Sequence, residues 1–144
     1  MMTEVNPTLQ TWLADFLKSA GAAAGTVHLH VDGGLRLAAA VNIPPPVQQA
    51  VEWVPNGKGM AGLALQRGEA VQTCNLQEDR TGAVKPGARA VNAQAAIAMP
   101  VREEGGGIVA IVGVAWMEER AIEGAELARL ETSARLLVEV MNAH

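Results

Sequence analysis

Two short turns, each between two apolar stretches, constrain the fold of this chain more than any other feature. Residues 32–34 (DGG) separate residues 27–31 from residues 35–41, and apolar side chains recur at every second position on both sides. Residues 103–107 (EEGGG) separate two further apolar stretches, 95–102 and 108–116. A short turn joins antiparallel strands, because parallel neighbours need a crossover of a dozen or more residues. The sequence therefore predicts two β-hairpins in an antiparallel sheet.

Both ends of the chain show the period of a helix instead. Asn6 and Pro7 predict a helix start, with Asn6 as the N-cap, and Gly21 predicts its end. Between them the apolar residues fall on one helical face. Residues 122–141 predict one closing helix, which is apolar around most of its circumference. A helix of that kind packs against two neighbours.

The middle of the chain is less regular. Residues 44–46 (PPP) end the second strand, since proline cannot donate to a sheet ladder. Residues 47–54 fit a helical turn followed by a short strand, residues 60–66 a short helix, and residues 70–74 an edge strand. The polar segment 76–92 predicts a long loop, and long loops in compact domains are usually lids or binding loops.

Composition limits the classes of function. The 144 residues fit one domain, residues 1–144, and about half of them are apolar, which allows a real core. The net charge of −4 and the scattered Lys and Arg argue against a nucleic-acid partner. One cysteine, Cys74, excludes an internal disulfide. No signal peptide or long apolar run is present, so we expect a soluble cytoplasmic protein without a membrane partner.

One motif invites a dinucleotide-binding interpretation. Residues 57–62 (GKGMAG) satisfy Gly-x-Gly-x-x-Gly, and acidic residues follow about 20 positions later. That fingerprint requires a buried parallel strand before the glycines and a long crossover helix after them. Here Pro55 precedes the glycines and Gly68 ends the helix after barely two turns. We therefore expect these glycines to serve a tight turn and close packing.

The order of several short motifs resembles the GAF domain family. Residues 57–64 (GKGMAGLA) and 68–71 (GEAV) resemble its central glycine motif and the strand that follows. Residues 96–101 (AIAMPV) and 111–116 (IVGVAW) resemble its last two strands. The resemblance spans roughly residues 25–141.

The resemblance implies an α/β (α+β) fold of the GAF type, which is profilin- and PAS-like. Its central antiparallel sheet would carry the terminal helices on one face, and the short helices and a lid loop on the other. It also implies a sensory module of signal transduction that binds a small molecule between sheet and lid. The residues that would line the site are Trp53, Met60, Thr73, Met99 and Trp116, with Arg80, Lys85 and Arg89 contributed by the lid. Three cations could close over a small anion.

Further alternatives remain open. His28 and His30 lie on one face of a strand, but no carboxylate or thiol is obviously placed to complete a metal site. We expect no cofactor, no catalytic set and no metal. The rival hypothesis is an enzyme that uses Cys74, similar to the free methionine-(R)-sulfoxide reductases of the same family, although a resolving thiol is missing. A third is a degenerate GAF domain that only dimerises. Apolar surface on both terminal helices predicts a homodimer through them.

Overall fold

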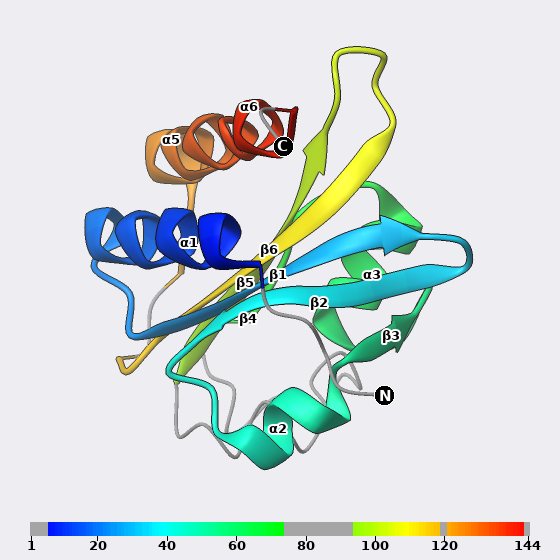
Figure 1. Cartoon of the computed structure of the whole chain (residues 1–144). Coiled ribbons are helices and arrows are strands. Elements are labelled where there is room, and N and C mark those ends of the chain that lie inside the picture. Colours follow the sequence, from blue (N-terminus) through cyan, green and yellow to red (C-terminus); the bar gives the residue numbers. More distant parts are fainter. Residues whose placement is uncertain (1–5, 74–93, 119–120, 143–144) are drawn as a thin grey trace.

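The computed structural model describes residues 6–73, 94–118 and 121–142, and its centre is one antiparallel six-stranded sheet (Figure 1). The strand order is β3-β2-β1-β6-β5-β4. The strands are β1 (Ala24–Val31), β2 (Gly34–Val41), β3 (Trp53–Pro55), β4 (Val71–Thr73), β5 (Ala95–Arg102) and β6 (Ile108–Trp116). The helices are α1 (Pro7–Ala20), α2 (Pro45–Ala50), α3 (Gly59–Arg67), α5 (Gly124–Arg135) and α6 (Leu137–Asn142). The predicted mixed fold with an antiparallel sheet is confirmed.

Local sequence signals account for most element boundaries. The Asn6 side chain accepts hydrogen bonds from the backbone N–H groups of Thr8 and Leu9 and so caps α1, while Gly21 ends it in the left-handed conformation at φ 67°. Both predicted hairpins form, β1 with β2 and β5 with β6. No helix in the described ranges is both long and apolar enough to cross a membrane.

The prediction of one closing helix over residues 122–141 is wrong in its continuity. The chain forms α5 and then α6, with a turn at Leu136 between them. The backbone N–H of Leu136 donates to the Ser133 carbonyl at 3.1 Å, an i to i−3 bond that tightens the last turn of α5. Apolar periodicity continues through such a turn, so the pattern alone does not reveal the break.

The two faces of the sheet carry different layers (Figure 1). Helices α1, α5 and α6 cover one face, which we call the α1-side face, and the larger core lies beneath them. Helix α3 covers part of the opposite face, which we call the α3-side face. The smaller core there includes Leu35, Val71, Ala98 and Ile111. The terminal helices therefore share one face, as predicted.

Candidate functional site

Small residues dominate one region of the α3-side face. The register pairs Thr26 with Ala40 and Gly113, Gly113 with Ala98, and Ala115 with Ala96. Paired residues share a face of the sheet, and Ala98 belongs to the core beneath α3. We call this set of six the small-residue floor: Thr26, Ala40, Ala96, Ala98, Gly113 and Ala115.

This floor remains partly open although it lies in the middle of the sheet. Strands β1 and β6 are the two central strands of the sheet and are paired on both sides. Thr26, Gly113 and Ala115 are nevertheless only half-buried. Short side chains on central strands thus leave accessible surface beside α3.

The floor also carries one hydroxyl group. A Cβ added to Gly113 would lie 2.8 Å from the Thr26 Oγ1 atom, so this hydroxyl lies directly over Gly113. The absence of a side chain at residue 113 therefore makes room for Thr26. The floor offers an apolar surface of short side chains with one small polar group.

The neighbouring row of the same face holds a buried histidine. His28 pairs with Leu37 and with Ile111, two residues along β1 from Thr26. Its side chain is only 3% exposed, and it is the buried polar residue of the described core. The Nε2 atom lies 2.9 Å from the carbonyl oxygen of Val51, which follows α2. The Nδ1 atom is buried and has no hydrogen-bond partner in the described part of the chain.

Geometry and burial together define the chemical state of this ring. A carbonyl oxygen only accepts hydrogen bonds, so Nε2 carries the proton that it donates to Val51. Burial lowers the pKa of His28, because the charged form loses its hydration, and the hydrogen bond to Val51 opposes this only in part. The ring is therefore neutral at pH 7, and Nδ1 presents a bare lone pair.

The lowered pKa predicts a loss of stability in acid. Below about pH 6.5, the ordinary histidine value, the unfolded chain binds a proton that buried His28 does not. The free energy of unfolding should therefore fall as the pH drops from 6.5 towards the lower pKa of the folded state. The slope from this group should be at most about 1.4 kcal/mol per pH unit.

Urea unfolding of the wild-type chain and of His28→Gln at a series of pH values checks this expectation. Glutamine does not titrate, so the difference between the two proteins isolates residue 28 from all carboxylates. The difference should change below pH 6.5 and stay constant above it. A difference that is flat across the whole range would contradict a buried neutral histidine.

His30 does not join His28 in a metal site. Its Nδ1 atom lies 2.8 Å from the carbonyl oxygen of Ile108. Each histidine thus contacts a backbone carbonyl, and no group of three metal-ligating side chains occurs among the described residues. His30 thus has a backbone partner, while the Nδ1 atom of His28 has none in the described part of the chain.

The five described residues of the predicted ligand site do not come together. Met60 packs against the smaller core, and Thr73 pairs with Ala96 of the floor, so both lie on the α3-side face. Met99 and Trp116 are almost fully buried in the core beneath the terminal helices. Trp53 is 46% exposed on edge strand β3.

Strand alternation explains this division. Successive residues point to opposite faces, so Met99 and Trp116 lie on the α1-side face, whereas Ala98 and Ala115 between them lie on the other. Trp53 pairs with Arg36, which pairs with Leu29 of the α1-side core. A contact of any of these residues with a ligand remains a prediction. The lid residues Arg80, Lys85 and Arg89, like Cys74, lie outside the described residues.

The residues that the structure brings together here were not singled out by sequence reasoning. Alanine and glycine in apolar strands are typical of close packing and carry no chemical signal. The register across β1, β6 and β5 is needed to place Thr26, Gly113 and Ala98 in one row. In the sequence, His28 stood out only as a polar residue that alternates with the apolar residues of its strand.

The glycine motif serves backbone packing, as expected. Gly57 and Gly59 have positive φ values of 87° and 64°, which other residues rarely adopt. A Cβ at Gly62 would lie 2.6 Å from the Pro55 carbonyl oxygen. Strand β3 before the motif has three residues and lies at the sheet edge, and helix α3 has nine residues. This is not the parallel strand and crossover helix of a dinucleotide site.

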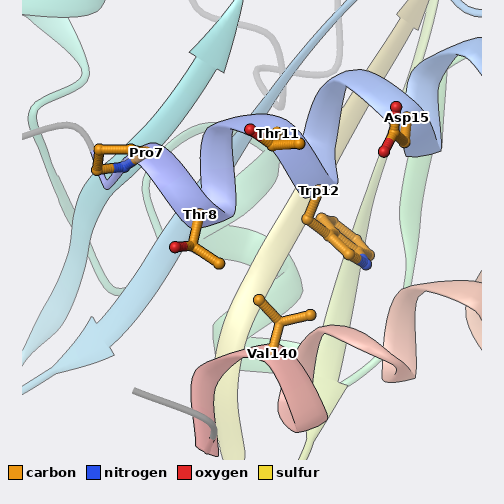
Figure 2. Close-up of a pocket in the computed structure, with 6 residues that line it drawn as sticks. All are labelled: Pro7, Thr8, Thr11, Trp12, Asp15 and Val140. Atoms are coloured by element: carbon orange, nitrogen blue, oxygen red, sulfur yellow. The ribbon is translucent and has the colours of Figure 1, made fainter.

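A separate groove lies between the terminal helices. Figure 2 shows Trp12 of α1 and Val140 of α6 facing one another across it. The groove has a volume of about 480 Å³, and its lining residues are Pro7, Thr8, Thr11, Trp12, Asp15 and Val140. The ring of Trp12 stacks on Phe16 at a centroid distance of 5.1 Å. This groove belongs to the outer helical layer and not to the α3-side face.

Known structures share this architecture. The type II free methionine-R-sulfoxide reductase of Thermoplasma acidophilum is 18% identical, with a TM-score of 0.74, over 94% of this chain and 90% of that chain. The GAF domain of the Acinetobacter phosphoenolpyruvate-protein phosphotransferase is 18% identical, with a TM-score of 0.74, over 99% and 86%. A domain of a two-component sensor histidine kinase protein, described as putative, from Sinorhizobium meliloti 1021 is 14% identical, with a TM-score of 0.72, over 98% and 93%.

Sequence comparison agrees with these structural likenesses. No curated protein sequence matches the chain. The family model of the GAF domain, however, matches residues 3–142, nearly the whole sequence. The glycine motif, the hairpins and the six-stranded sheet all lie within this match. The chain therefore belongs to the GAF domain family.

Proposed function

We propose that this chain is a small-molecule-binding regulatory domain whose ligand lies on the α3-side face of the sheet. The observation that carries the proposal is the small-residue floor: Thr26, Gly113 and Ala115 lie on central strands and are only half-buried. Ligand sites are mostly apolar with a few convergent polar groups, and here these are Thr26 and His28. The domain of a two-component sensor histidine kinase protein among its structural neighbours supports a regulatory role.

The output of such a domain would pass through contacts with another chain. Leu136, between α5 and α6, is 54% exposed, and the Trp12–Val140 groove lies on the same helical layer. We propose that two copies associate through their terminal helices, and that ligand binding shifts the population of helix arrangements.

Native mass spectrometry of the purified full chain tests both parts at once. The expected result is a dimer that carries the mass of a retained small molecule. Leu136→Glu should shift the protein towards monomer, whereas Met117→Glu should not, because Met117 is similarly exposed at 49% but follows β6. A protein that is monomeric at all concentrations would contradict the proposed dimer. A ligand-free protein that binds no tested small molecule would contradict the proposed sensor function.

A second candidate function is an enzyme activity like that of the reductases among the structural neighbours. The observation that favours it is their TM-scores of 0.74 and 0.65 to this chain. Reduction of a sulfoxide to a sulfide consumes two electrons and two protons and releases water, so a thiol reductant must be supplied. The chain has one cysteine, Cys74, to attack the sulfoxide sulfur.

Incubation of the protein with free methionine-(R)-sulfoxide and dithiothreitol distinguishes the two functions. Methionine formation that is lost in Cys74→Ser would establish the enzyme. Equal rates with the wild-type chain, Cys74→Ser and no protein would exclude it and leave the binding function in place.

A further inference from the structure

The buried lone pair of His28 requires an explanation that the described fold does not supply. A buried acceptor without a partner loses its hydrogen bond to water and gains nothing in return. An apolar residue would fill the same position among Leu37 and Ile111 without that cost. The Nε2 atom is accounted for by Val51, so the open question concerns Nδ1 alone.

The ring lies beside the small-residue floor. His28 and Thr26 are alternate residues of β1 and so project from the same face, and their partners on β6 are Ile111 and Gly113. Val51 lies between α2 and β3, on the β2 side of β1. The two nitrogens of an imidazole point in diverging directions, so Nδ1 does not face Val51. The adjoining row on the same face of the sheet is the small-residue floor.

We propose that the Nδ1 atom of His28 accepts a hydrogen bond from a small, uncharged and largely apolar molecule that lies on the small-residue floor. The molecule must carry an N–H or O–H group, because Nδ1 can only accept in the ring state that the Val51 contact imposes. It is flat and apolar, because alanine and glycine provide a surface without charge. This inference rests on the proposed function and narrows the class of ligand. An anion that is bound only by cationic side chains would belong to a different class.

Two substitutions separate the nitrogens of this ring. In His28→Gln the side-chain amide reaches the position of Nε2 and can still donate to Val51, but the acceptor at Nδ1 is lost. In His28→Asn the amide oxygen lies near the position of Nδ1 and can still accept, but the contact with Val51 is lost. If His28 had only a structural role, His28→Gln should lose little stability and His28→Asn should lose more. If His28 binds a ligand through Nδ1, His28→Gln should lower the affinity for that ligand more than His28→Asn does.

Indole and 1-methylindole are matched probes for the ligand class. Both are flat and apolar, and only indole has an N–H donor. We expect the full-length wild-type chain to bind indole about tenfold more tightly than 1-methylindole in a calorimetric or NMR titration. His28→Gln should remove this preference, and His28→Asn should retain part of it. The ¹⁵N resonance of His28 Nδ1 should move when indole is added, and it is assigned by its loss in His28→Gln.

A third variant, Ala115→Val, tests where the probes bind. Ala115→Val adds two methyl groups to the half-buried floor and should weaken the binding of both probes equally. Urea unfolding of this variant is the control that the sheet is intact. If both probes bind equally and only Ala115→Val weakens them, the proposed function stands and the role of His28 is overturned. If neither probe binds, the ligand class inferred here is overturned. The retained mass in native mass spectrometry then decides the proposed function separately.

Discussion

Replacing Trp116 with alanine should lower the free energy of unfolding by about 3–5 kcal/mol, the usual cost of removing a large aromatic side chain from a core. Trp116 is 1% exposed in the core beneath the terminal helices. Its indole N–H also donates to the Ala20 carbonyl oxygen at 3.2 Å, which joins the end of β6 to the end of α1. Urea unfolding followed by circular dichroism measures the loss.

Two further variants show which contacts of Trp116 account for the loss of stability. Trp116→Phe keeps a ring but removes the hydrogen bond to Ala20 and should fall between the wild-type chain and Trp116→Ala. Trp53→Ala removes the same side chain from a position that is 46% exposed and should cost much less. Equal losses at residues 53 and 116 would contradict the assignment of Trp116 to the core.

The second large effect is expected at Gly62, the last glycine of the motif in residues 57–62. Alanine is ordinarily the better helix former by about 1 kcal/mol, so Gly62→Ala in α3 would stabilise the chain if there were space. Its Cβ, however, would lie 2.6 Å from the Pro55 carbonyl oxygen and 3.2 Å from the Gly57 nitrogen. Both are backbone atoms that cannot rotate away. We expect a net loss of about 1–3 kcal/mol.

Gly105→Ala is the matched control for this substitution. Its Cβ would have the Glu103 side chain 3.9 Å away as its nearest neighbour, so its stability should stay close to that of the wild-type chain. Urea unfolding of both variants gives the comparison. If Gly62→Ala were as stable as Gly105→Ala, then close packing would not explain the glycine, and approach of a ligand to the backbone would become the better explanation.

The sequence-based predictions agreed best with the structure where a signal depends only on residues that are neighbours along the chain. Asn6 and Gly21 cap α1 as predicted, and the two turns place both hairpins. Gly68 ends α3 with a positive φ of 71°. These signals are local, because a cap or a turn is satisfied by neighbours along the chain.

At the candidate site, the sequence and the structure point to different residues. The resemblance to the GAF family implied that Trp53, Met99 and Trp116 would line it. In the structure, small side chains gather at the floor, where Gly113 lies under Thr26. A missing side chain gives little signal in a sequence, whereas in the sheet it defines accessible surface.

The sequence by itself determined most of the elements, the two antiparallel hairpins and the role of the glycine motif, because turn geometry and hydrophobic period depend on nearby residues. The tertiary structure alone decided which residues share a face across β1, β6 and β5, and which nitrogen of His28 has a partner. When the register of a strand slips by one residue, every side chain of that strand moves to the opposite face of the sheet. The bulge between Val27 and His28 is such a shift, and it aligns His28 with Leu37 and Thr26 with Ala40 on one face. Such long-range alignment depends on packing between distant segments, so only the folded sheet brings His28 beside the floor.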